Sequence, residues 1–379
     1  MARRRWEQQS LSALVDSVNS LCGTSGSSAE VESDASRSFI ARARVAVEER
    51  AAEERSENIS VQEAVSALLK SKAGYTDCSV VDTGGLASYE PGNVSLPDDT
   101  RGSPLLRDVC SSKTSDFLDD ITLMLNSEGE GEAAGDARQP QLYMDPVLAN
   151  NVGRKGGHYH AFIRDLARRG LVRFTRRKLG GVTVFFVRKK TGQLRMIIDA
   201  RVVNKDFKRS PPVHMCSPEI LADLECAADD VVYSATIDIK DCFHRLRLDD
   251  SLSDYFCLPG GTAASFGLTQ KDVFLPDDIV YPACSCLPMG FSWSVFFAQD
   301  VATEMVRRSG VFTSADEVRD GYADTLLNRD RFFCYVDNIG VLGKDAAAVD
   351  VALNAIKDVL LQNGLLTHDH VTATTCQDI

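Results

Sequence analysis

Alternation of apolar and polar residues becomes regular near residue 171, in the stretch LVRFTRRKLGGVTVFFVRKKTGQLRMIIDAR. A period of two residues predicts β-strands that bury one face. The pair Gly180 and Gly181 and the pair Thr191 and Gly192 interrupt the pattern, and glycine favours turns at such points. The sequence therefore predicts three short strands between residues 171 and 201.

Helical and extended patterns then alternate without a regular repeat. Strands are predicted at VVYSATIDIKD and, as a hairpin, at FFCYVDNIGVLG, residues 332–343. Helices are predicted at HAFIRDLARRG, at GFSWSVFFAQDVATEMVRR, at DAAAVDVALNAIKDVLLQNG, and at CSPEILADLECAA with Ser217 as its cap and Pro218 in its first turn. This irregular mixture predicts an α+β fold rather than a regular parallel one.

Residues 1–140 have a different amino-acid composition. Serine, glycine and acidic residues dominate segments such as CGTSGSSAEVESDASRS and NSEGEGEAAGDARQPQ, a composition typical of linkers or disordered chain. Two stretches rich in helix formers, SFIARARVAVEERAAEER and SVQEAVSALLKSK, interrupt them. The sequence predicts an acidic, low-complexity arm over residues 1–140 that is largely disordered or weakly helical. An interaction tail is an alternative use of the same arm.

Charge is distributed unevenly between the two parts. The formal net charge is −12, and residues 1–150 hold 14 basic and 25 acidic side chains. Residues 151–209 instead hold 17 basic side chains and only three acidic ones. Such a local excess is a candidate binding surface for phosphate groups, although the whole chain is acidic.

The eleven cysteines lie mostly in apolar surroundings, which predicts reduced core thiols of an intracellular protein. Cys284 and Cys286 are the closest pair, but their one-residue spacing is a poor zinc signature. His158 and His160 predict a solvated helix start rather than a metal site.

No apolar run approaches the length of about 18 residues that a membrane helix needs, and the amino-terminal segment lacks the apolar core of a secretion signal. The sequence predicts a cytoplasmic or nuclear protein without a membrane segment.

Acidic side chains stand where two predicted strands end. Asp238 and Asp241 lie in IDIKD, and Asp337 lies in YVDN, 99 residues after Asp238. A carboxylate at the end of a buried strand resists desolvation unless a cation lies beside it. Two such acids on adjacent strands predict a Mg²⁺ site suited to phosphoryl transfer. The alternative is that each Asp only caps a turn.

Four motifs in order resemble the fingers and palm of a reverse transcriptase from a retroelement. They are VFFVRKKTGQLRMIIDARVVNK, IDIKDCFHRLRL, LPMGFSWSVFFAQ and FFCYVDNIGVLG. The resemblance covers roughly residues 171–366 and leaves out the first 140. It implies a right-hand polymerase fold, an RNA-directed DNA polymerase (nucleotidyltransferase) activity with Mg²⁺ or alternatively Mn²⁺, and an RNA or DNA template with its primer and a dNTP as partners.

The resemblance also implies roles for individual residues. Asp238 and Asp337 would bind metal together with the carbonyl of Ile239, and Asn338 stands where the family usually has a second Asp. The nucleotide-binding positions it implies are Lys189, Lys190 and Arg195 for the triphosphate, Asp241 and Phe243 beside the sugar, and Met289 and Gly290 under the base pair. Phe243 would exclude a 2′-hydroxyl, so that dNTPs are preferred.

The resemblance further implies a division into a basic fingers-like region at residues 141–212 and a palm-like catalytic region at residues 213–379. No room for a thumb follows, so a fragment of a longer protein is one interpretation. Asn338 removes one negative charge from the expected site, which predicts reduced activity. The alternative is a catalytically inactive, nucleic-acid-binding remnant. His368 or His370 lies where relatives position a Lys or His able to protonate pyrophosphate, and a plain loop histidine is the favoured interpretation over that role.

Overall fold

The computed structural model describes residues 86–127, 141–154, 156–227, 229–268, 274–321 and 326–376, without the side chain of Glu219. The strands are β1 (Leu86–Ala87), β2 (Val172–Thr175), β3 (Thr183–Arg188), β4 (Leu194–Asp199), β5 (Tyr233–Ile239), β6 (Gly261–Thr262), β7 (Ile279–Cys284), β8 (Arg331–Tyr335), β9 (Asn338–Gly343) and β10 (Thr367–Thr375).

The α-helices are α4 (Leu106–Val109), α5 (Ser112–Asp119), α6 (Pro146–Ala149), α7 (His158–Arg168), α8 (Pro218–Ala222), α9 (Cys242–Arg245), α10 (Asp250–Ser253), α11 (Ala263–Phe266), α12 (Ser294–Arg308) and α13 (Ala346–Gln362). Three single 3₁₀ turns, η2 (Ile121–Leu123), η3 (Val203–Lys205) and η5 (Ser314–Asp316), complete the described elements. The fold therefore mixes helix and antiparallel sheet, as the α+β prediction requires.

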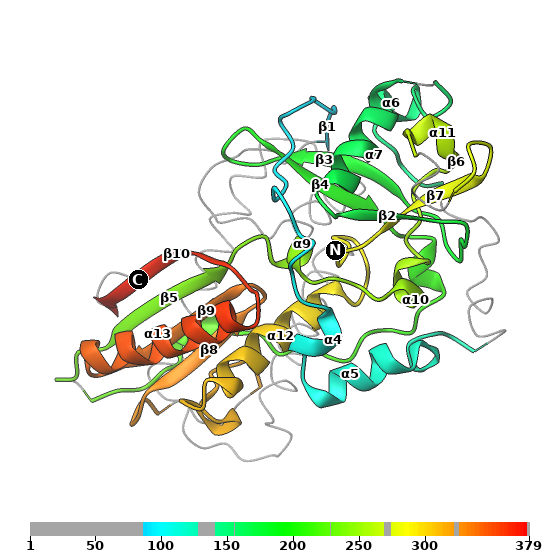
Figure 1. Cartoon of the computed structure of the whole chain (residues 1–379). Coiled ribbons are helices and arrows are strands. Elements are labelled where there is room, and N and C mark those ends of the chain that lie inside the picture. The colour runs from blue at the N-terminus through cyan, green and yellow to red at the C-terminus, as the bar shows by residue number, and fades with distance from the viewer. Residues whose placement is uncertain are drawn as a thin grey trace, which may run out of the picture. The chain divides into compact units, whose positions relative to one another are not determined.

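A four-stranded antiparallel sheet in the order β10-β5-β9-β8 forms one part of the described structure (Figure 1). Strand β5 lies inside the sheet and buries Ala235, Ile237 and Ile239 almost completely. Helix α13 packs against β5, β9 and β10, and α12 contacts both β8 and α13. Because β5 lies inside the sheet and α13 packs against it, the strand that carries Asp238 belongs to the closely packed core.

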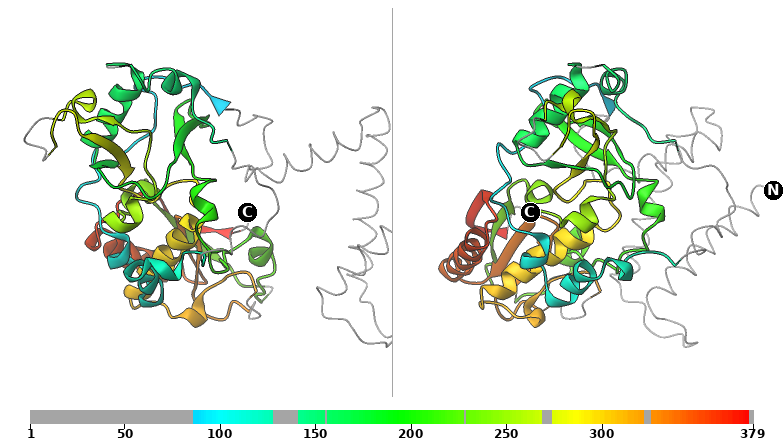
Figure 2. Two further views of the ribbon diagram at one scale, coloured as in Figure 1. Left: turned by 90° about the vertical axis from the view of Figure 1, so that its right-hand side faces the viewer. Right: turned by 45° about the vertical axis from the view of Figure 1, so that its right-hand side comes forward.

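Two smaller antiparallel sheets form the other part, in the orders β1-β3-β4 and β2-β7-β6 (Figure 2). Helix α7 contacts β2 and also α11. The rings of Tyr89, Phe162 and Phe186 meet edge-on or tilted, with centroids 5.2 to 5.8 Å apart, and tie the segment after β1 to α7 and β3. The three strands predicted between residues 171 and 201 are confirmed as β2, β3 and β4.

The prediction of a poorly packed arm was wrong for residues 86–127. Leu106, Val109 and Met124 are at most 1% exposed and belong to the main hydrophobic core. Apolar residues in this segment are separated by acidic ones, so its average composition hides an amphipathic pattern, and α4 within it packs against α12. The two predicted helical stretches at residues 38–55 and 60–72 lie outside the described residues.

Other local predictions have mixed outcomes. Helix α8 begins at Pro218, and the Ile220 amide donates to the Ser217 hydroxyl over 3.4 Å, although the helix is shorter than expected. His158 is exposed at the start of α7, but His160 is only 2% exposed, so the prediction of a solvated pair was wrong for His160. It packs against the Phe266 ring at 5.0 Å, because the inner face of α7 turns toward α11.

Seven of the nine cysteines within the described ranges are buried, as expected for core thiols. Among the described residues, no helix combines the length and apolarity that a membrane crossing requires.

Candidate active site

The ends of β5 and of the β8–β9 hairpin bring the two predicted carboxylates to one edge of the sheet. Asp238 pairs in register with Asn338, and the Ile239 amide donates to the backbone carbonyl of Asp337 over 2.8 Å. Asp238 and Asp337, which are 99 positions apart in the chain, are therefore immediate neighbours across adjacent strands.

The hairpin turn that carries Asp337 has an unusual backbone. Tyr335 pairs with Asn338, so Val336 and Asp337 alone form the turn, and Val336 has a φ of +59°. A β-branched residue in this left-handed region costs on the order of 1–3 kcal/mol and persists only where its surroundings enforce it.

Gln299 of α12 supplies that enforcement. Its side-chain amide donates to the Cys334 carbonyl over 3.0 Å, and its oxygen accepts from the Val336 amide over 2.7 Å. Gln299 is only 6% exposed. No pattern in the sequence marks Gln299, because its role depends on a contact between α12 and a turn 37 positions away.

Both acids have a raised pKa. Burial, and then the charge of Asp337, raise the pKa of Asp238 to about 6, while His368 acts in the opposite direction. Burial also raises the pKa of Asp337, although the charges of Arg195 and His368 and a hydrogen bond from Asn338 act to lower it. A pair of partly desolvated carboxylates that repel each other is stabilised by a cation.

The donor set fits a hard divalent cation. Carboxylate oxygens are among the ligands that Mg²⁺ prefers, and Asp238 and Asp337 bring two carboxylates to this edge. The Ile239 carbonyl as a further ligand stays a prediction. The third polar group, Asn338, is exposed, and its side-chain amide lies 3.4 Å from the Asp337 carboxylate. Within the described ranges, no group of three or more His, Cys, Asp or Glu side chains is arranged to hold a metal. The residues thus fit a site with two carboxylates rather than three.

His368 lies directly against this site. It belongs to strand β10, opposite Asp238 in register, so the interpretation as a plain loop histidine was wrong. Its Nε2 is 2.7 Å from Oδ1 of Asp238, and its Nδ1 is 2.9 Å from Oδ2 of Asp369. His370, by contrast, has a buried Nε2 with no hydrogen-bond partner in the described chain.

Basic residues of the β3–β4 hairpin face the acids to different degrees. Arg195 is an exposed residue of β4 whose charge acts to lower the pKa of Asp337, which places it near the edge that carries the two carboxylates. Lys189 donates to the Ser95 hydroxyl over 3.1 Å and so is tied to the segment after β1. Lys190 is exposed at the turn that follows β3. Arg195 is thus linked electrostatically to Asp337.

The chain after β5 turns sharply before α9. Asp241, the N-cap of α9, has a φ of +54°, and Asp tolerates this conformation better than most residues. Phe243 lies in the same helix, partly buried against the core. The two predicted sugar-side residues are therefore placed three and five positions after Asp238 on a short, constrained segment.

The loop that contains Met289 and Gly290 is fastened to β4. The Ile198 amide donates to the Met289 carbonyl over 2.9 Å. Gly290 has a φ of +130°, and a Cβ atom there would lie 1.9 Å from the Ile198 carbonyl oxygen. Asn204 adds a donor to the Gly290 carbonyl over 2.9 Å. Only glycine fits this contact, which fixes Met289 relative to β4.

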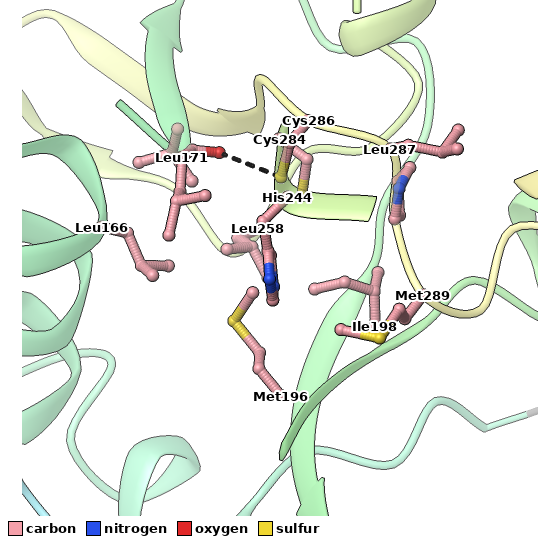
Figure 3. A pocket seen from close by; sticks show the side chains of 12 residues that line it. Leu166, Leu171, Met196, Ile198, His244, Leu258, Cys284, Cys286, Leu287 and Met289 are labelled. Carbon is pink, nitrogen blue, oxygen red and sulfur yellow. Dashed lines mark hydrogen bonds between the residues drawn. The ribbon is translucent and has the colours of Figure 1, made fainter. Parts of the chain in front are cut away.

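A small cavity lies beneath this loop (Figure 3). It has a volume of about 10 Å³ and is lined by Leu166, Leu171, Val172, Met196, Ile198, His244, Leu258, Cys284, Cys286, Leu287, Pro288 and Met289. His244 points into it, with its Nε2 buried and unpartnered in the described chain, and burial lowers its pKa to about 4. A space of this size holds one water at most, so it is a packing void rather than a ligand site.

One known family matches about half of the chain. A family model described as "Reverse transcriptase (RNA-dependent DNA polymerase)" matches residues 187–377. The matched span contains both carboxylates, Arg195 and the loop of Met289 and Gly290. A search among curated proteins finds no match.

Proposed function

Because the chain belongs to the reverse transcriptase (RNA-dependent DNA polymerase) family, we propose that it adds dNTPs to a primer 3′-hydroxyl at the edge formed by Asp238 and Asp337. The family carries out template-directed nucleotidyl transfer in general. The observation that carries the specific proposal is the hydrogen bond from the Ile239 amide to the Asp337 carbonyl, which makes the two acids neighbours.

We assign residues 141–212 to a fingers-like region and residues 213–379 to a palm-like region. A divalent ion bound at Asp238 and Asp337 would lower the pKa of the primer hydroxyl and neutralise charge on the transferred phosphate. The protein's own contribution is to hold these carboxylates fixed. Gln299 does so by fastening the turn that carries Asp337.

Other residues would select and orient the nucleotide. Arg195 offers a planar guanidinium for the triphosphate, and Lys189 and Lys190 offer point charges. The ring of Phe243 would lie beside the sugar and leave no room for a 2′-hydroxyl. Met289 would form an apolar surface under the template–nucleotide pair, which predicts few polar contacts to the base there.

Primer extension on poly(rA)·oligo(dT) with Mg²⁺, and in parallel with Mn²⁺, tests the proposal. The full chain should incorporate dTTP, and Asp337→Ala should abolish incorporation. Asp358→Asn, an exposed change on α13, is the matched control and should leave it intact. Absence of any incorporation that depends on Asp337, with either metal, would reject polymerase activity.

A catalytically inactive, nucleic-acid-binding remnant is the second candidate. Asn338 favours it, because an amide donates to Asp337 where an acid would bind the ion. This candidate predicts salt-dependent RNA binding without incorporation, and no gain of synthesis in Asn338→Asp. Synthesis that appears or increases in Asn338→Asp would instead mean that the remaining geometry is competent.

A further inference from the structure

The edge strand β10 has an irregularity directly beside the two carboxylates. It lies at the outer edge of the four-stranded sheet, next to β5 (Figure 1). The register of β10 with β5 shifts between His368 and Val371. As a result, Asp369 and His370 of β10 together lie opposite the single residue Ile237. An extra residue of this kind is a β-bulge, and bulges beside active sites commonly re-aim a side chain.

Asp369 adopts an uncommon backbone conformation within this bulge. Its φ of +48° lies in the left-handed region, which few non-glycine residues adopt. Within the described ranges, the non-glycine residues with positive φ are Asp241, Val336 and Asp369. The first two lie on the segments that carry Asp238 and Asp337, and the third lies beside His368. Because strained backbone gathers at functional sites, this shared location indicates that the bulge of β10 is part of the site.

The bulge holds the imidazole of His368 between two carboxylates. Its Nε2 lies 2.7 Å from Oδ1 of Asp238, and its Nδ1 lies 2.9 Å from Oδ2 of Asp369. A ring that is held at both nitrogens keeps one orientation. A carboxylate has two oxygens and about four acceptor positions, so a single donor orients Asp238 and leaves it able to bind an ion.

We propose that His368 is a positioning residue for Asp238, and that the bulge at Asp369 aims its Nε2 so that the carboxylate is fixed in the orientation that binds the divalent ion. The inference rests on the proposed function, because it takes Asp238 as a metal ligand. Hydrogen-bonding partners of metal ligands typically change metal affinity or activity by about 10- to 100-fold when they are removed. The role differs from proton donation to pyrophosphate, in which the ring would act on the leaving group.

Magnesium affinity tests the positioning role without catalytic turnover. It is taken from the rise in Tm of the full chain as MgCl₂ is added to protein prepared in EDTA. His368→Leu should weaken Mg²⁺ binding about tenfold, the lower end of that range, because the His368 side chain is 42% exposed. His368→Gln keeps an N–H donor and should recover most of the affinity. His158→Leu, the same change at the exposed start of α7, is the control and should match the wild type.

Two further measurements separate the bulge from the histidine and positioning from proton donation. Asp369→Gly retains the left-handed backbone without strain but removes the carboxylate that holds the ring, so Mg²⁺ affinity should fall by less than in His368→Leu. In primer extension, His368→Leu should lower kcat by a larger factor than it raises KM for dTTP. His368→Gln should restore part of kcat, although an amide cannot act as an acid. Circular dichroism in EDTA verifies folding, and Asp369→Gly keeps the test available if His368→Leu does not fold.

The inference and the proposed function fail in different ways. Stabilisation of the wild type by Mg²⁺ without incorporation that depends on Asp337 would reject polymerase activity alone, and weaker Mg²⁺ binding by His368→Leu would then still support the positioning role. Wild-type Mg²⁺ affinity in His368→Leu would overturn the inference. If kcat also fell equally in His368→Leu and His368→Gln, the histidine would be a proton donor instead. Absence of any effect of Mg²⁺ on the wild-type Tm would overturn the inference as well.

Discussion

Replacing Asp238 by Asn should stabilise the protein while it removes polymerase activity. The pKa of Asp238 is raised from 3.8 to about 6, chiefly by burial and by Asp337. Ionising such a group at pH 7 costs about 3 kcal/mol at 1.36 kcal/mol per pKa unit. The Asp238 side chain is 19% exposed to solvent, and the charges of Asp337 and His368 act on its pKa in opposite directions. We therefore expect a gain of about 1–3 kcal/mol in Asp238→Asn.

The pH dependence has a definite sign. Because the folded-state pKa of Asp238 is raised, the folded protein loses stability as pH rises from about 4 through 6, where the unfolded chain is already ionised. The advantage of Asp238→Asn should be near zero at pH 4 and complete by pH 7. For a unit of this size it corresponds to a rise in Tm of about 2–8 °C.

Calorimetric unfolding in EDTA and in MgCl₂ measures both effects. In EDTA at pH 7 the variant should melt above the wild type. Mg²⁺ should raise the Tm of the wild type by binding only the folded state, and should raise that of Asp238→Asn much less. Asp358→Asn, on the exposed face of α13, should match the wild type throughout. An Asp238→Asn protein that is less stable in EDTA at pH 7, or whose advantage is the same at pH 4, would refute the reasoning.

Three further perturbations test the scaffold of the site. Gln299→Leu leaves the Val336 amide without its acceptor, so urea unfolding should show that the free energy of unfolding falls by about 1–3 kcal/mol. In primer extension, kcat should fall by a larger factor than KM rises. An unchanged kcat would contradict the positioning role. Gly290→Ala should destabilise the fold and abolish incorporation, because its Cβ would overlap the Ile198 carbonyl oxygen, and a wild-type Tm would exclude this contact. Burial lowers the pKa of His244 to about 4, so the free energy of unfolding should fall by up to about 3 kcal/mol as pH drops from 6.5 to 4. Urea titrations at several pH values should show a weaker dependence of stability on pH in His244→Leu. An equal dependence in the two proteins would disprove the assignment.

Local periodicity predicted the elements that carry the site. The alternation in β3, β4 and β5 and the two apolar runs of the β8–β9 hairpin are sequence signals with a direct physical cause, because each strand buries one face or both. The order of the motifs predicted that Asp238 and Asp337 would meet. Their adjacency depends on antiparallel pairing of β5 with β9, which local sequence does not specify.

Contacts between distant segments were beyond reach of the sequence. Residues 86–127 looked like part of an acidic arm, yet Leu106 and Met124 are in the core, because burial depends on the distant segments against which they pack. His368 gave no signal of its contact with Asp238, since the register of an edge strand decides it. Gln299 was equally hidden in a helix whose other faces are apolar.

The position of Asn338 follows from the electrostatics of this edge. In register it lies directly opposite Asp238, beside Asp337, where the two acids already resist ionisation. A third carboxylate there would add repulsion in the absence of a cation and attraction in its presence. Asn338 therefore favours the stability of the metal-free fold over the strength of cation binding. The substitution Asn338→Asp should reverse that balance, lowering the Tm in EDTA and steepening its dependence on Mg²⁺ concentration. Because both effects share one cause, a variant that showed only the first would mean that the ion is not bound at this edge.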